Sequence, residues 1–207
     1  AKNHASVTVV CDPADYDRVL EQIEKDGNTS EDLRKELAAK VFKRTTMYDA
    51  AIASFFSEGG VDGMLLTNKR ELRYGENPHQ EGAFYELSST APGWEVVQEE
   101  KQMSYLNILD ADSAWNLVSE FEEPTAACIK HANPSGVASQ EDIAEAFQRC
   151  YDADRLSAFG VIIALNRKCP GEVVQKIIDQ KIFAEILIAP GYDDGALEIL
   201  KKKKNLR

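Results

Sequence analysis

A lysine and a histidine stand side by side where an apolar stretch gives way to turn-forming residues. Residues 125–129 (Thr-Ala-Ala-Cys-Ile) predict a buried strand, and Lys130 and His131 follow it directly. The Asn-Pro-Ser-Gly sequence of residues 133–136 is typical of a turn. An imidazole can exchange a proton near neutral pH, an ammonium can stabilise developing negative charge, and open α/β sheets bind ligands at such strand ends. The alternative is a strand end that carries two solvated polar residues.

The directions of these two side chains depend on where the strand ends. Neighbouring side chains on a strand point to opposite faces, so Lys130 and His131 would diverge if the strand continued. We expect a break into a turn at Pro134 to bring both side chains into one cleft.

Residues that commonly bind metals are scattered along the sequence. No two cysteines form a Cys-x-x-Cys pair, and no zinc motif can be assembled from the spacings of Cys11, Cys128, Cys150, Cys169, His4, His79 and His131. Without a secretory signal, free thiols in a reducing cytoplasm are the expected state. The sequence therefore predicts a cytoplasmic protein without a zinc site.

Composition and charge limit the classes of function. The 207 residues carry a formal net charge of −11, which argues against a nucleic-acid binder or a protein of acidic membranes, since both need a basic face. A small anionic substrate needs only a local cationic pocket and is not excluded. No apolar run approaches the ~20 residues of a membrane span, and residues 1–10 do not resemble a signal peptide. Both ends look cut, so we expect a fragment of a longer protein.

The first part of the chain predicts an incomplete α/β segment. Residues 6–11 predict a strand, residues 14–24 a helix, and a capping Thr29 or Ser30 begins a second helix that extends to Phe56. A boundary is expected at 57–62. Beyond it, we expect a polar loop at 72–80, strands at 83–87 and 94–98 joined through Pro92 and Gly93, and a helix over 108–121.

From about residue 100 onward, predicted strands and helices alternate. Further strands are expected at 161–165 and 186–189, and further helices at 139–151, 172–180 and 194–203. Continuous apolar runs are typical of strands that are buried on both faces. The predicted fold class is therefore α/β, with a three-layer α/β/α sandwich.

Three strings carry a resemblance to a known family: LRYGENPHQ at 72–80, IKHANPSG at 129–136 and SAFG at 157–160. In this order they resemble the bifunctional AICAR formyltransferase/IMP cyclohydrolase family of purine biosynthesis, and the likeness continues through 104–115 and 189–192. The resemblance implies that residues 1–63 are the end of the cyclohydrolase domain. Residues 64–207 would be the first subdomain of the formyltransferase domain, with a cytidine-deaminase-like fold that has lost its zinc.

The family reaction transfers a formyl group from 10-formyltetrahydrofolate to the 5-amino group of AICAR, and the cyclohydrolase then closes the product to IMP. The resemblance implies that His131 is the base that takes a proton from the attacking amine. It implies that Lys130 stabilises the developing oxyanion or helps the folate nitrogen to leave.

The resemblance also implies substrate-binding residues near the start of the formyltransferase part. Arg73 and Tyr74 match a pair that contacts the nucleotide, and a guanidinium suits a phosphate. An exposed loop pair is the alternative interpretation. Asn107 matches a residue that contacts the base, and it can also serve as a helix N-cap.

Three further positions follow from the same resemblance. Gly160 would let the backbone approach the ligand, or it is simply the glycine at a strand entry. Glu185 would accept hydrogen bonds from the ribose hydroxyls, or it is an exposed acid at a strand start. Lys2 matches a lysine of the cyclohydrolase site, whose other groups lie outside this sequence.

Two classes of function remain open for the chain by itself. In the first, the chain is the half of the enzyme that carries the catalytic lysine; the full-length enzyme works as a homodimer, with AICAR and a folate as partners. In the second, the chain is a nucleotide-binding or inert fragment without turnover. A zinc deaminase of the same fold is disfavoured, because the His-x-Glu and Pro-Cys-x-x-Cys motifs are absent from the sequence.

Overall fold

A computed structural model describes residues 1–87, 93–98 and 100–207. The chain divides into two compact units, the first formed by residues 1–67 with Leu87 and the second by 68–86 and the described residues from 93 to 207.

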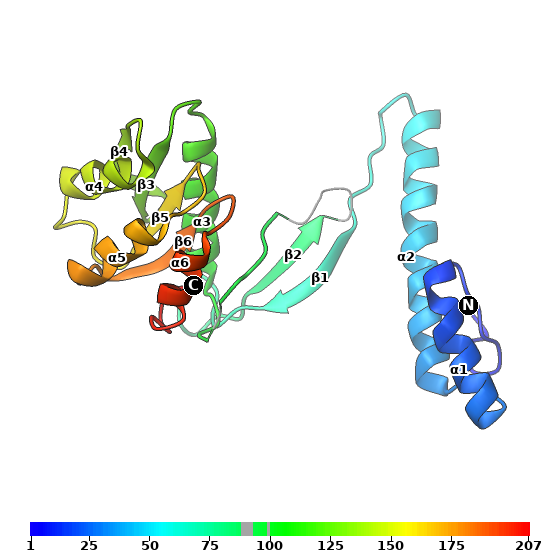
Figure 1. The fold of residues 1–207 in the computed structure, drawn as a ribbon. Coiled ribbons are helices and arrows are strands. Elements are labelled where there is room, and N and C mark those ends of the chain that lie inside the picture. The colour runs from blue at the N-terminus through cyan, green and yellow to red at the C-terminus, as the bar shows by residue number, and fades with distance from the viewer. Residues whose placement is uncertain (88–92, 99) are drawn as a thin grey trace. The chain divides into compact units, whose positions relative to one another are not determined.

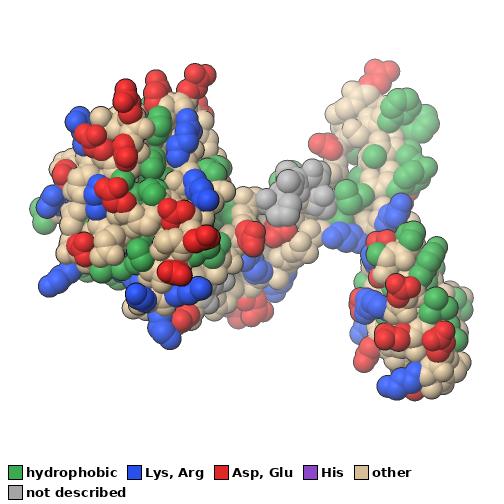
Figure 2. All heavy atoms as spheres, viewed as in Figure 1, with side chains coloured by type: hydrophobic (Ala, Val, Ile, Leu, Met, Phe, Trp, Pro, Cys, Tyr) green, Lys and Arg blue, Asp and Glu red, His purple; other side chains and the backbone are tan. Residues whose placement is uncertain are grey.

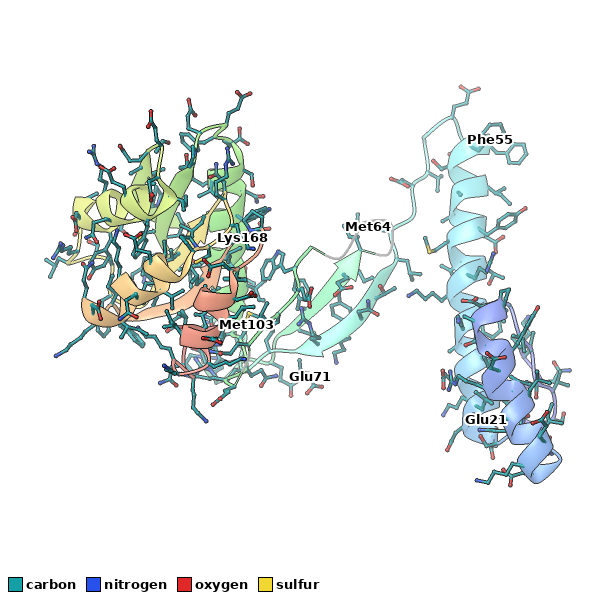
Figure 3. The ribbon with its side chains drawn as sticks, viewed as in Figure 1. Glu21, Phe55, Met64, Glu71, Met103 and Lys168 are labelled. Atoms are coloured by element: carbon teal, nitrogen blue, oxygen red, sulfur yellow. The ribbon has the colours of Figure 1, made fainter. Side chains whose placement is uncertain are left out.

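The first unit is helical. A short 3-10 turn at Pro13–Asp15 leads into α1 (Tyr16–Asp26), and α2 (Glu31–Phe56) follows (Figure 1). Gly27 ends α1 in the left-handed conformation that glycine adopts without strain, and the Ser30 hydroxyl caps α2 by accepting from the Leu33 amide at 3.2 Å. At the other end of α2, the Phe55 ring (Figure 3) is exposed. The Phe56 ring is exposed as well.

The predicted strand at 6–11 is wrong, and so is the α/β character expected for this segment. Within the described residues no strand pairs with 6–11. Side chains of α2 bind the backbone at its end and just before it: Arg44 donates to the carbonyl of Cys11 at 3.0 Å, and Arg34 donates to the carbonyl of His4 at 2.8 Å. An apolar alternation therefore did not produce a strand where no partner strand was available.

A two-stranded sheet consists of β1 (Leu66–Glu71) and β2 (Ala83–Leu87), connected by the predicted polar loop. Most of its residues, 68–71 and 83–86, belong to the second unit. β2 was expected, whereas the polar sequence of β1 gave no strand signal. The strand predicted at 94–98 is wrong, because these residues form no ladder. Pro92 of the predicted turn lies outside the described residues.

A four-stranded sheet forms the centre of the second unit, in the order β4-β3-β5-β6. Its strands are β3 (Thr125–Lys130), β4 (Asn133–Ser139), β5 (Val161–Leu165) and β6 (Ala184–Ile188). β3 is antiparallel to β4 and β5, and β5 is parallel to β6. β3, β5 and β6 were predicted to within two residues at their ends, whereas β4 was predicted as a turn.

Helices cover both faces of this sheet, which confirms the three-layer prediction (Figure 1). On one face, α3 (Tyr105–Ser119) packs its Ala111, Ala114 and Val118 against alternate residues of β3 and β5. The intervening residues face α4 (Ile143–Ala153), α5 (Gly171–Asp179) and α6 (Asp194–Leu200). The central strands are thus buried on both faces, as their continuous apolar runs indicated.

Charged side chains of both signs occur on the surface of the second unit. Acidic and basic side chains are interspersed over the face seen in Figure 2. In the part of the chain that the structure describes, no helix combines the length and the apolar character that crossing a bilayer requires.

Candidate functional site

One edge of the four-stranded sheet collects most of the predicted site residues. Because β3 runs antiparallel to β5, the end of β3 at Lys130 lies beside the start of β5, next to Gly160. Because β6 is parallel to β5, its start also lies at this edge, where Val161 pairs with Ala184 and Glu185 follows. The sheet topology therefore brings together residues from three strand ends that are up to 55 positions apart in the sequence.

Lys130 and His131 sit at a tight hairpin, but the turn lies elsewhere than expected. Lys130 pairs with Asn133, so His131 and Ala132 form a two-residue loop, with φ values of 53° and 59°. Two positive φ values define a type I′ turn, which normally favours asparagine and glycine. The turn predicted at 133–136 is wrong because these residues form β4, an edge strand that tolerates the missing N–H of Pro134.

The Lys130 side chain reaches across to the start of β5. Its ammonium donates a hydrogen bond to the carbonyl of Phe159 and lies 5.6 Å from the centre of the Phe159 ring. Gly160 follows with φ +71°, and a Cβ added there would lie 3.8 Å from the Lys130 Nζ atom. The Gly160 amide donates to the Phe183 carbonyl at 2.8 Å, which fixes this backbone beside the lysine.

Asn107 and Glu185 contact each other through their side chains. The Asn107 Nδ2 atom donates to Glu185 Oε2 at 2.7 Å, and the Arg207 guanidinium lies 3.6 Å from the same oxygen. Asn107 is not the N-cap that we considered, because α3 starts earlier, with Ser104 at the cap. Asn107 occupies the third position and completes a capping box by accepting from the Ser104 amide at 3.1 Å. It therefore has both a capping role and a place at the sheet edge.

Asp110 is a member of this group that the sequence did not reveal as a site residue. It lies one turn after Asn107 on α3, is 7% exposed, and accepts from both amides of the hairpin turn. The distances are 2.8 Å from the Ala132 amide and 3.3 Å from the His131 amide. In the sequence Asp110 looked like an acid placed near the positive end of a helix. Nothing in the residues around Asp110 indicated that it binds the amides of His131 and Ala132, which lie 21 and 22 positions later.

We call Asn107, Asp110, Lys130, His131, Gly160 and Glu185 the sheet-edge site. The site combines cationic, imidazole, amide and carboxylate groups around one strand terminus. A left-handed conformation costs a non-glycine residue roughly 1–2 kcal/mol, and here two adjacent residues adopt it. Such strain persists where the surroundings hold it, and it clusters at functional sites.

Arg73 and Tyr74 form their own pair in the loop between β1 and β2. The guanidinium stacks over the Tyr74 ring at 4.6 Å and donates to its hydroxyl at 2.7 Å. The backbone of this loop joins the start of α3, because Arg73 donates to the Met103 carbonyl at 2.9 Å and Tyr74 accepts from the Tyr105 amide at 3.2 Å. The loop is thereby connected to the helix that carries Asn107 and Asp110.

A separate hollow of about 520 Å³ lies beside the edge strand β6. Its lining is mainly apolar and aromatic, with Trp94, Trp115 and Tyr192 among its residues. None of the six residues of the sheet-edge site lines it. The hollow and the sheet-edge site are therefore distinct features of the second unit.

Comparison with known proteins identifies the family of the chain. Residues 1–207 match the family described as the AICARFT/IMPCHase bienzyme. The chain belongs to this family. Its relatives include proteins named bifunctional purine biosynthesis protein PurH from Lactococcus lactis subsp. cremoris (46% identical), Anoxybacillus flavithermus (48%) and Bacillus subtilis (46%). In each case the whole chain is aligned, but it spans only 42% of the relative's length.

Lys2, the residue that the resemblance assigned to the cyclohydrolase site, lies in the first unit. Lys2 is exposed, in the turns that precede residue 7. Lys2 belongs to the first unit, whereas the sheet-edge site belongs to the second.

The cysteines of this bienzyme family member are all free thiols, as expected. Cys128, Cys150 and Cys169 are buried, and burial raises the pKa of Cys169 to about 12. The pKa of the Cys150 thiol is also raised, through its hydrogen bond with Cys128 and through burial. Among the described residues, no group of three or more His, Cys, Asp or Glu side chains is arranged to hold a metal ion.

Proposed function

We propose that this chain is the part of a formyltransferase that binds AICAR and moves the proton during formyl transfer. The observation that carries the proposal is the meeting of Lys130, His131, Gly160 and the Asn107–Glu185 pair at one sheet edge, in a member of the AICARFT/IMPCHase family. Purine biosynthesis is the process, as the names of the PurH relatives suggest. The co-substrate is 10-formyltetrahydrofolate.

In the proposed reaction, the 5-amino nitrogen of AICAR attacks the formyl carbon and forms the new C–N bond. The bond between the formyl carbon and N10 of the folate then breaks. The His131 imidazole takes the proton that the amine loses, and that proton goes to N10, so the products are formyl-AICAR and tetrahydrofolate. The Lys130 ammonium stabilises the negative charge on the formyl oxygen in the tetrahedral state.

The proposed contacts with the nucleotide follow from the chemical type of each side chain and from its position in the fold. The Arg73 guanidinium binds the phosphate, and Tyr74, which stacks on it, orients the nucleotide. Glu185 accepts hydrogen bonds from the ribose hydroxyls, Asn107 contacts the base, and the bare backbone at Gly160 permits close approach.

The domain assignment is a proposal as well. Residues 1–63 form the end of the cyclohydrolase domain, with Lys2 as a remnant of its site, and 64–207 form the first subdomain of a cytidine-deaminase-like formyltransferase domain. The full-length protein is a cytoplasmic homodimer. Because the chain spans 42% of its relatives' length, the second candidate is a nucleotide-binding module that does not turn over by itself.

Formyl transfer can be tested by mixing this chain with the remaining C-terminal part of the PurH relative from Bacillus subtilis and following tetrahydrofolate release. We expect activity that Lys130→Ala and His131→Ala abolish. Lys168→Ala is the matched control, because Lys168 is an exposed lysine beyond the opposite end of β5 (Figure 3). Equal activity of Lys130→Ala and Lys168→Ala would refute the assignment of the site. AICAR binding without turnover in the mixture would favour the second candidate.

A further inference from the structure

We propose that Asp110 is a positioning residue, which aims the His131 imidazole by holding the hairpin turn in its left-handed conformation. The inference deepens the proposed function, since it rests on His131 being the group that moves the proton. Asp110 itself is not required to touch the substrate.

The first argument is the fit between the carboxylate and the turn. Each of the two residues with positive φ, His131 and Ala132, donates its amide to a different oxygen of Asp110. Neither residue is the glycine or asparagine that a type I′ turn favours. The turn therefore has an unfavourable sequence, and both of its backbone amides are bound by one buried carboxylate, that of Asp110 on α3.

The second argument concerns what else orients the imidazole. His131 is an exposed residue, and among the described residues none forms a hydrogen bond with its ring. The direction of the ring is then set by the backbone from which it projects. A change in φ at His131 would point the ring in another direction, so the carboxylate that holds the turn amides acts on the imidazole through the turn.

The third argument is that α3 ties this turn to the nucleotide side of the site. Asp110 and Asn107 are three residues apart, and positions separated by three share one face of a helix. Asn107 binds Glu185 at 2.7 Å while Asp110 binds the hairpin. One rigid helix face therefore sets the spacing between the proposed ribose-binding carboxylate and the proposed base.

The test compares AICAR affinity, measured by calorimetry, in four variants of this chain. Asp110→Asn keeps one acceptor oxygen but places a side-chain N–H opposite one of the two turn N–H groups, so one hydrogen bond to the turn is lost. We expect this variant to bind AICAR at least tenfold more weakly (about 1.4 kcal/mol). Asp110→Asn combined with Ala132→Gly should recover most of the affinity, because glycine adopts positive φ without strain. Ala132→Val, with Asp110 intact, should weaken binding in the same way as Asp110→Asn. Asp112→Asn is the matched control, since Asp112 is an exposed acid on the same helix that pairs with Asn116.

The outcomes separate this inference from the proposed function. Rescue of Asp110→Asn by Ala132→Gly supports positioning through the turn, whereas an unrescued loss overturns it, as does wild-type affinity in Asp110→Asn. If the wild-type chain binds no AICAR, the proposed function fails for this chain, and the backbone φ values of residues 131 and 132 are measured by NMR instead. A changed φ in Asp110→Asn then supports the inference, and an unchanged φ overturns it. If Asp110→Asn does not fold, the exposed Ala132→Val variant decides in the same assays.

Discussion

Replacing Gly136 with alanine should strongly destabilise the second unit. Gly136 ends the Asn-Pro-Ser-Gly string and lies in β4, where its φ is not positive, so its backbone conformation suits any residue. What requires glycine is close approach. An added Cβ would lie 3.0 Å from the carbonyl carbon of Cys150 on α4, closer still to the carbonyl oxygen, and 3.1 Å from the Ala153 Cβ.

The magnitude follows from the rigidity of these neighbours. A backbone carbonyl within a helix cannot rotate away, so α4 must shift from the sheet, and the Cys150 thiol would lose its 3.1 Å hydrogen bond to the Gly136 carbonyl. Overpacking of this kind costs about 3 kcal/mol, at the upper end of the usual range. For a unit of this size, that corresponds to a fall in Tm of roughly 10 °C.

The assay is urea and thermal unfolding followed by tryptophan fluorescence, since Trp94 and Trp115 both lie in the second unit. Gly191→Ala is the matched control, because an added Cβ there meets nothing within 4 Å and φ is not positive. We expect its free energy of unfolding to change by no more than about 0.5 kcal/mol. Equal stability of Gly136→Ala and Gly191→Ala would refute the close approach of β4 and α4.

Three other properties follow from burial and backbone conformation. Burial raises the pKa of Cys169 and Tyr192 to about 12 each, so the folded state keeps protons that the unfolded chain releases from about pH 9 upward. The free energy of unfolding should therefore fall as pH rises from 9 to 12, and Tyr192→Phe should make that fall shallower in urea titrations at each pH. Of the four cysteines, only Cys11 is not buried, so a thiol reagent should label one site rapidly in the native protein and all four in urea; rapid labelling of a second thiol would contradict the described packing. Gly27→Ala should cost the first unit about 1 kcal/mol, because φ is +69° while the added methyl group meets no neighbour; unchanged helix melting by circular dichroism would count against the left-handed cap.

The sequence was most informative where burial decides the structure. The apolar runs at 125–129 and 161–165 predicted strands that are buried on both faces, and the sheet contains both. Ser30 caps α2 as one of the two expected residues. The helix expected from 139 is present but begins at Ile143 with Asp142 as its cap, because Ser139 belongs to β4. In these segments local preference and tertiary packing favour the same conformation.

The failures occurred where a partner far along the chain decides the conformation. β4 carries turn-forming residues, yet pairing with β3 and packing against α4 make it a strand. The strand expected at 6–11 has the pattern but no pairing partner among the described residues. The hairpin at His131–Ala132 depends on Asp110, which lies 21 positions earlier on another element. The sequence could nominate Lys130 and His131 by type and resemblance, but it could not identify the carboxylate that binds the turn amides of His131 and Ala132.

Calorimetric titration of AICAR into this chain tests the central claim most directly. We predict saturable binding with a Kd below 1 mM (about −4.1 kcal/mol), weakened by Arg73→Ala and by the double change Lys130→Ala/His131→Ala, but not by Lys168→Ala. No binding at millimolar AICAR, or binding that Arg73→Ala leaves unchanged, would contradict a nucleotide site at this edge of the sheet.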